Sequence, residues 1–210
     1  MINKYLEKLK KEIKITKALL RSRSASNGMS YVELIVVLSI FAILSAVSMF
    51  SYREFQANVD IRNLASDIAS KIVEAQKSSL DGKWNVSADP NWKPSYGVYF
   101  NTTDSDTQKQ FIYFVDLVNA GDYDEPLEEL DTISITKGNY ISSINKCTTT
   151  PCDSNNSINS LAIIFKRPDS SAIFADLDVP GSGYVQITII SPQGKTAFIK
   201  IYPSGRIQVN

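Results

Sequence analysis

Residues 29–50 read MSYVELIVVLSIFAILSAVSMF, and this stretch decides the organisation of the whole chain. Its last seventeen residues, Leu34 to Phe50, carry no charge. Together with Met29 to Val32 they approach the length that an α-helix needs to cross the hydrocarbon core of a bilayer. No other part of the sequence has a comparable apolar run, so we predict one membrane-spanning helix over about residues 30–50.

The segment before this helix is strongly basic. Residues 1–28 hold eight Lys or Arg against Glu7 and Glu12, a net charge of +6, and because the full chain is neutral the remainder carries −6. Positive residues beside a membrane span keep that end of the chain in the cytoplasm. We therefore expect a single-pass protein of the cytoplasmic membrane, with a cytoplasmic leader over residues 1–28 and the C-terminal part outside.

Beyond Phe50 the apolar pattern narrows to one stripe of a helix. Large apolar residues recur at about helical spacing while charged residues fill the other positions. The stripe consists of Phe55, Val59, Leu64, Ile68 and Ile72. Asp81-Gly82 is the first helix-stop signal, which predicts one long helix over residues 29–82. Its first half should contact lipid or other helices, and its second half should pack one face on a domain.

Residues 83–210 have the pattern of a single β-rich domain outside the membrane. Short apolar and β-branched runs separated by turn residues indicate strands at 96–100, 111–115, 133–136, 161–165 and 172–175. The last three runs, 184–190, 196–202 and 206–209, are joined by Gly-containing turns and predict an antiparallel meander. The expected fold class is α+β, a long N-terminal helix packed on an antiparallel β-sheet domain.

The two cysteines lie in the sequence Cys147-Thr-Thr-Thr-Pro-Cys152. An extracytoplasmic location favours a disulfide between them, and the alternative is two free thiols in an exposed loop. A zinc site is not expected because the chain has no His and no second Cys pair to complete four ligands.

Glu33 stands out because it places a carboxylate inside the start of the apolar run. A carboxylate in the hydrocarbon region costs several kcal/mol and is normally paired. Cleavage after Gly28 would create a partner, since the new α-amine of Met29 would lie four residues before Glu33. Either the pair forms within one chain, or the Glu33 of one subunit meets the amine of a neighbour and sets the register between their helices.

The run from a basic leader through Gly28, Met29 and Glu33 into an unbroken apolar helix resembles type IV prepilins and type II secretion pseudopilins. The match covers residues 21–50. The resemblance implies a pilin fold, cleavage after Gly28 by a membrane prepilin peptidase, N-methylation of Met29, and assembly by an inner-membrane platform into a helical filament with other subunits. This sequence departs from the pattern at Met29, where Phe is usual, at Tyr31, and in the length of its leader.

A weaker resemblance covers the β-rich part. The sequence Ser95 to Phe100 (SYGVYF) and the closing Pro203 to Ile207 (PSGRI) are similar to minor pseudopilins of the H type and related minor pilins. Such subunits lie at or near the tip of the filament. Whether this chain serves a surface pilus or a secretion pseudopilus stays open at this point.

Two other readings of the N-terminal half compete with this one. Ala46-Val47-Ser48 offers a conventional signal-peptide cleavage site, but a cut there would discard Glu33 and half of a helix whose pattern continues. The chain could also be an anchored extracellular binding protein that never polymerises. Catalysis is not expected, and no cofactor is implied, because His, a Gly-rich phosphate loop and a Gly-x-Ser-x-Gly elbow are all absent from the sequence.

Two charged clusters suggest further binding functions. Residues 122–131 (DYDEPLEELD) contain six acidic residues and could hold calcium, although the spacing matches no EF-hand and a solvated loop is the simpler interpretation. A DNA-uptake role would use a basic patch on the C-terminal strands, against which the charge of −6 argues. The patch would comprise Lys166, Arg167, Lys195, Lys200 and Arg206. Aromatic residues of the strands are expected in the core.

Overall fold

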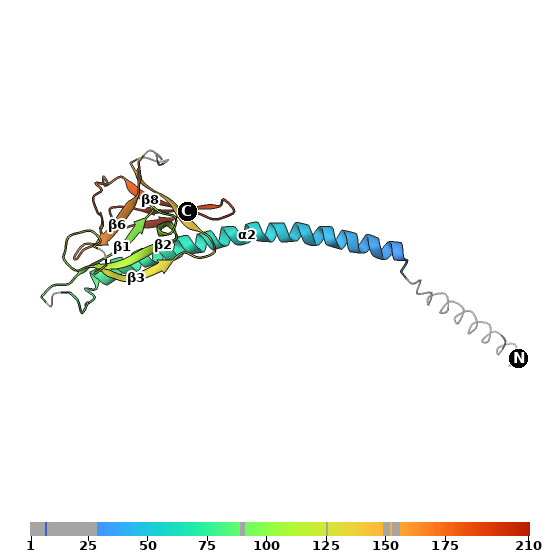
Figure 1. Cartoon of the computed structure of the whole chain (residues 1–210), viewed down its shortest axis with the longest axis horizontal. Coiled ribbons are helices and arrows are strands. Elements are labelled where there is room, and N and C mark those ends of the chain that lie inside the picture. The colour runs from blue at the N-terminus through green and yellow to red at the C-terminus, as the bar shows by residue number, and fades with distance from the viewer. Residues whose placement is uncertain (1–6, 8–28, 89–90, 125, 149–151, 153–155) are drawn as a thin grey trace. The chain divides into compact units, whose positions relative to one another are not determined.

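The computed structural model describes residues 7, 29–88, 91–124, 126–148, 152 and 156–210. A helix, α2 (Tyr31–Leu80), is followed by a series of strands (Figure 1). The chain divides into two compact units, Met1–Phe50 and Ser51–Asn210, and the boundary falls within α2. The predicted helix over residues 29–82 is therefore present, two residues shorter at each end.

The strands form two antiparallel sheets of five strands each. The first has the order β3-β2-β1-β6-β7 and the second the order β10-β9-β8-β4-β5. Their bounds are β1 (Ser95–Asn101), β2 (Gln110–Asp116), β3 (Glu129–Ser134), β4 (Tyr140–Cys147), β5 (Ser157–Ile158), β6 (Ser160–Phe165), β7 (Ala172–Phe174), β8 (Tyr184–Ile190), β9 (Thr196–Ile201) and β10 (Ile207–Val209). A short 3-10 helix, η1 (Thr107–Lys109), precedes β2. The α+β class is confirmed, and the strands are divided between two sheets.

The predicted meander at the C-terminal end is confirmed. Strands β8, β9 and β10 are sequential neighbours, with Ile187 opposite Ile199 and Ile201 opposite Ile207. The two connecting turns place Gly194 and Gly205 at φ values of 74° and 78°, where glycine is favoured because it lacks a Cβ. The glycines that predicted these turns in the sequence therefore occupy the positive-φ positions of the turns in the structure.

Strand β4 was not predicted from the sequence. Its apolar residues Ile141 and Ile144 are three positions apart, which breaks the alternation expected of a strand. A bulge between Ile141 and Ser143 in the pairing with β8 inserts one residue, so both isoleucines reach the core. The short strand β5 was also not predicted from the sequence.

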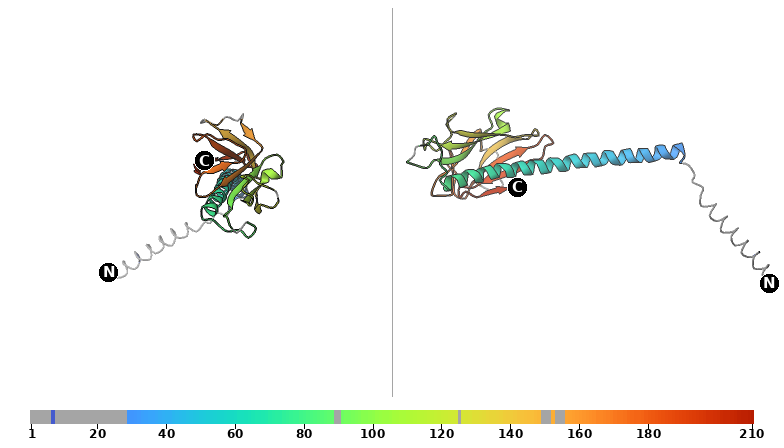
Figure 2. Two further views of the ribbon diagram at one scale, coloured as in Figure 1. Left: turned by 90° about the vertical axis from the view of Figure 1, so that its left-hand side faces the viewer. Right: turned by 90° about the horizontal axis from the view of Figure 1, so that it is seen from below.

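Within the unit Ser51–Asn210, α2 and the inner faces of both sheets share one hydrophobic core. The buried face of the helix carries Ala57, Ile61, Ala65, Ile68, Ile72 and Ala75. The prediction was wrong for Phe55 and Val59, whose side chains are 66% and 38% exposed. Small alanines occupy the buried face because they let the helix approach the sheets closely, and the left view of Figure 2 shows α2 between the green and the red strands.

Polar contacts tie the last turns of α2 to the strands. The Tyr113 hydroxyl donates to Ser78 Oγ at 3.0 Å, the Ser79 hydroxyl donates to the carbonyl oxygen of Phe165, and Gln76 Nε2 donates to the carbonyl oxygen of Ser170 at 2.8 Å. The helix ends at Leu80, and the turn that follows contains Gly82 with a φ of 60°, in agreement with the Asp81-Gly82 stop signal. These contacts hold the last turns of α2 against the first sheet and the connection between β6 and β7.

The tyrosines beside this junction give the stability a dependence on alkaline pH. Burial raises the pKa of Tyr113, the hydrogen bond with Ser78 opposes the increase, and Glu74 adds to it; burial and Tyr113 raise the pKa of Tyr96. An unfolded tyrosine titrates near pH ~10, so the unfolded chain loses these protons first. The contribution of these two tyrosines to the free energy of unfolding should be fully present below about pH 10 and should decrease as the pH rises above that value.

The measurement is urea unfolding at increasing pH, with tyrosinate absorbance followed in parallel on the folded protein. Tyr113→Phe should remove one late-titrating group and weaken the pH dependence. Tyr52→Phe is the matched control, because Tyr52 is 64% exposed. An unchanged pH profile in Tyr113→Phe would contradict the assignment.

Candidate assembly surface

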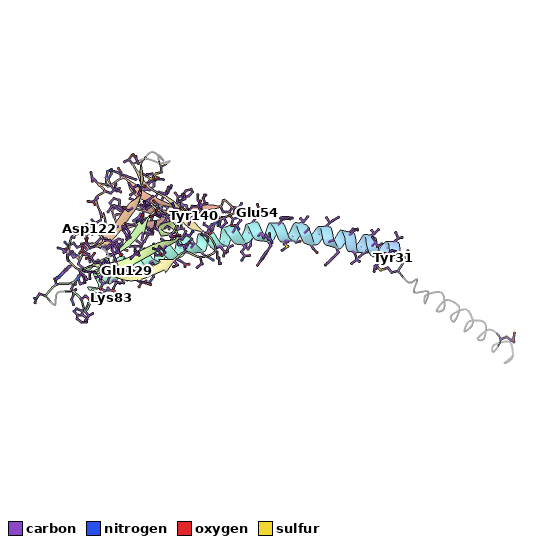
Figure 3. All side chains as sticks on the ribbon, in the orientation of Figure 1. Tyr31, Glu54, Lys83, Asp122, Glu129 and Tyr140 are labelled. Atoms are coloured by element: carbon purple, nitrogen blue, oxygen red, sulfur yellow. A yellow bond between two sulfur atoms is a disulfide. The ribbon has the colours of Figure 1, made fainter. Side chains whose placement is uncertain are left out.

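The first half of α2 exposes nearly all of its apolar side chains. The helix is long and apolar enough to cross a membrane, and none of its most apolar eighteen-residue window is buried within the chain. Side chains project from all sides of it, beginning at the labelled Tyr31 (Figure 3). In water this surface would cost a large free energy, so the segment requires lipid or other helices around it.

Glu33 lies in the first turn of α2, as the sequence suggested. The helix begins with a hydrogen bond from the Leu34 backbone N–H to the carbonyl oxygen of Ser30 at 3.0 Å. A carboxylate in this position is favourably placed against the positive end of the helix dipole. Met29 is exposed, whereas Gly28 lies outside the described residues, so cleavage between them and the pairing of the Met29 amine with Glu33 stay predictions.

A smaller apolar stripe lies on α2 beyond the candidate membrane-spanning segment. Tyr52, Phe55 and Val59 are exposed on the helix side opposite the buried Ile61 and Ile68. Their spacing of three and four residues places them on one face. From the sequence, Phe55 and Val59 were assigned to the stripe that packs on the domain, so this exposed face was missed. It is available for another helix.

The disulfide predicted from the two cysteines is present. Cys147, the last residue of β4, is joined to Cys152, and their Cα atoms are 4.9 Å apart. Cys147 is buried and lies opposite Tyr184 of β8. The bridge therefore fixes the end of a central strand to the loop that follows it.

Loss of this bridge should lower the free energy of unfolding by about 2 kcal/mol, because the closed loop is short and constrains the unfolded chain only moderately. Urea unfolding of Cys147→Ser/Cys152→Ser checks the value, and reduced wild-type protein should match it. Equal stability of the oxidised protein and the double variant would contradict a structural role.

The acidic segment is organised by its own carboxylates. Glu128 is buried and accepts hydrogen bonds from the backbone N–H of Leu117 at 2.7 Å and of Asp124 at 3.0 Å. Buried Asp116 accepts in the same way from Ala120 and Gly121. Among the described residues no group of three acidic, His or Cys side chains is placed to hold a metal ion. These carboxylates fold the loop between β2 and β3.

The basic residues considered for DNA binding are divided between the two sheets. Lys166 and Arg167 follow β6 of the first sheet, and Arg167 lies against Gly82 at the end of α2. Lys200 lies over the Tyr184 ring at 5.1 Å, and the Arg206 guanidinium lies 3.8 Å from the Tyr202 ring centre. Lys200 and Arg206 are therefore each placed over a tyrosine ring of the same chain, and Tyr184 is itself buried.

The aromatic residues of the strands are mostly core residues, as expected. Tyr96, Phe100, Phe111 and Phe114 are at most 2% exposed, and Gly97 lets this packing form. A Cβ on Gly97 would lie 2.6 Å from the Ile163 carbonyl oxygen and from the Phe114 ring. This steric requirement gives a structural reason for the glycine in the SYGVYF sequence.

Comparison with protein-family models, with curated proteins and with solved structures finds no significant match to this chain. The candidate surface is therefore assigned from the structure of this chain alone. Its parts are the exposed apolar half of α2, Glu33 in the first turn, and the stripe formed by Tyr52, Phe55 and Val59.

Proposed function

We propose that this protein is a structural subunit of a type IV pilus or a type II secretion pseudopilus, processed by a prepilin peptidase and assembled through α2. The observation that carries the proposal is a single carboxylate, Glu33, in the first turn of a helix whose most apolar eighteen-residue window is not buried in the described part of the chain. A simple anchor needs the apolar surface but has no use for the carboxylate.

The exposed stripe on the second half of α2 supports the same function. A plain membrane anchor would be free to end its apolar face where the lipid ends. Here Tyr52, Phe55 and Val59 extend an exposed apolar face into the unit Ser51–Asn210. Neighbouring helices in a filament would bury both the lipid-length segment and this stripe, and the burial would stabilise the assembly.

The β-rich part would then be displayed on the outside of the filament. Its disulfide suits an oxidising compartment, which agrees with a cytoplasmic leader and an exported domain. The interactions proposed for the subunit are those with other subunits, the peptidase, the inner-membrane platform, and lipid before assembly. No catalytic role is proposed.

The experiment that tests this function is intact-mass analysis with N-terminal sequencing of the protein extracted from membranes. A chain that starts at N-methylated Met29 is the expected result. An uncut chain would indicate a membrane anchor, and a chain that starts at Met49 would indicate a secreted domain, so either outcome would overturn the proposal.

A further inference from the structure

Two sheet edges flank α2 within the unit Ser51–Asn210. On one flank, β10 ends the second sheet, and Ile207 and Val209 lie beside Ala69 and Val73 of the helix. On the other flank, β3 ends the first sheet, and Ile133 and Ser134 line a hollow with residues of α2 that include Leu64 and Lys71. Unpaired edges are ready sites for strand addition unless they are covered.

The backbone of β10 presents hydrogen-bonding groups toward its open side. Asn210 exchanges both backbone hydrogen bonds with Phe198, and the carbonyl oxygen of Arg206 accepts from Tyr202. Along an antiparallel strand, residues that exchange backbone hydrogen bonds with the neighbouring strand alternate with residues whose N–H and C=O groups point away from it. Ile207 and Val209 are of the second kind, so their N–H and C=O groups point away from β9. Within the described part of the chain, no backbone hydrogen bond to another segment is found for these two residues.

A groove of about 710 Å³ lies along this flank of α2. Its apolar lining comes from Ala69, Val73, Ile207 and Val209, and Lys77, Lys83, Glu74 and Asp81 supply its charges. Glu74 is paired with Lys71 at 3.0 Å. With Glu74 paired, Lys77 and Lys83 face one remaining carboxylate, Asp81, so this flank favours an acidic occupant.

The β3 edge has the complementary chemistry. The backbone N–H of Ile135 donates to the carbonyl oxygen of Lys109. Because bonded and unbonded residues alternate along the strand, the N–H and C=O groups of Thr132 and Ser134 point to the open side of β3. Glu129 and Asp131 place two carboxylates on this edge, of which Asp131 lies 3.9 Å from Lys71 Nζ of α2, and Leu130 is 42% exposed. An exposed leucine between two carboxylates matches an apolar groove bordered by cations.

The remaining sheet edges are less suitable. The N–H of Ala172 in β7 donates to the carbonyl oxygen of Pro203 at 2.9 Å, so part of that edge is already occupied. Strand β5 has only two residues. Among the described strands, β3 and β10 therefore offer the best-matched pair of edges.

We propose that the β3 edge of one copy adds to the β10 edge of the next copy, with Leu130 directed to the groove beside α2. The inference rests on the proposed function and gives it a second contact besides the helix bundle. The two surfaces differ, so the contact is head-to-tail, and such a contact propagates through a filament instead of closing a dimer.

Thiol crosslinking of the full-length chain in membranes and in isolated filaments tests this contact. Ser134→Cys places a thiol on β3, and Gln208→Cys places one on β10; both positions are exposed. The native cysteines are paired in the disulfide, so a short bismaleimide should react only with the new thiols. Ser182→Cys, exposed in the turn before β8 and on neither edge, is the matched control.

A covalent dimer is expected when Ser134→Cys and Gln208→Cys are co-expressed, and no dimer when either is expressed alone or when Ser182→Cys replaces one of them. A dimer from Gln208→Cys alone would show a symmetric β10 contact and overturn the proposal. Chains that start at Met29 and form filaments without the mixed crosslink would overturn it while leaving the proposed function intact. The mixed crosslink in an uncut chain would support the contact and reject the filament function.

Discussion

Replacing Glu33 with alanine is expected to reduce incorporation of the subunit into filaments roughly tenfold or more, while insertion into the membrane is unchanged or improved. On insertion scales a charged side chain costs about 2.5–3.5 kcal/mol at the centre of a membrane-spanning helix. Glu33 lies in the first turn, so an assembled state that pairs it gains a preference of at most that order. Each 1.4 kcal/mol corresponds to about a tenfold change in an equilibrium. Alanine removes both the cost and the preference.

The measurement is the ratio of filament-associated to membrane-extracted protein, determined for each variant at equal expression. Glu33→Gln separates charge from size and should also assemble poorly. Glu54→Ala is the matched control, because it removes an exposed carboxylate from the same helix beyond the apolar segment. Incorporation of Glu33→Ala at the wild-type level would reject the role of Glu33 in setting the register.

Ile68→Ala should lower the free energy of unfolding of the β-rich unit by about 2–5 kcal/mol. Ile68 is fully buried in the core that α2 shares with both sheets, so the shorter side chain loses contacts and leaves a cavity. Much of the stability of a single domain would be lost.

Phe55→Ala provides the comparison for this effect. It removes a larger side chain from the same helix, but one that is 66% exposed, so stability should change by less than about 0.5 kcal/mol. Urea unfolding of both variants in detergent solution, followed by circular dichroism, gives the values. If the two variants were equally destabilised, the assigned buried face of α2 would be wrong. Phe55→Ala should instead weaken assembly, since its ring lies on the exposed stripe.

Features that follow from an apolar pattern over many residues or from a clear turn signal were the easiest to predict from the sequence. The helix was predicted from an apolar run and a continuing stripe, and its end from Asp81-Gly82. Residues 184–190 were predicted as a strand with the bounds that β8 has in the structure. Such features depend on local chemistry, namely hydrophobic periodicity and the conformational freedom of glycine.

Packing against distant segments was harder to predict. The stripe on α2 was assigned by side-chain size, which selected Phe55 and Val59, whereas the sheets select Ala57 and Ala65 because small residues allow close approach. Strand β4 was missed because its bulge is produced by pairing with β8. Neither effect has a signal in the local sequence.

By itself the sequence determined one membrane-length helix with Glu33 in its first turn, a β-rich domain, and a cysteine pair suited to a disulfide. Only the tertiary structure decided that the strands form two sheets, since β1 pairs with β6 and β4 with β8 across long stretches of chain. It also decided which side of α2 is buried and which sheet edges stay open beside it. The physical reason is that hydrophobic periodicity acts between neighbours in the chain, whereas strand order and helix burial depend on which distant surfaces pack together most closely.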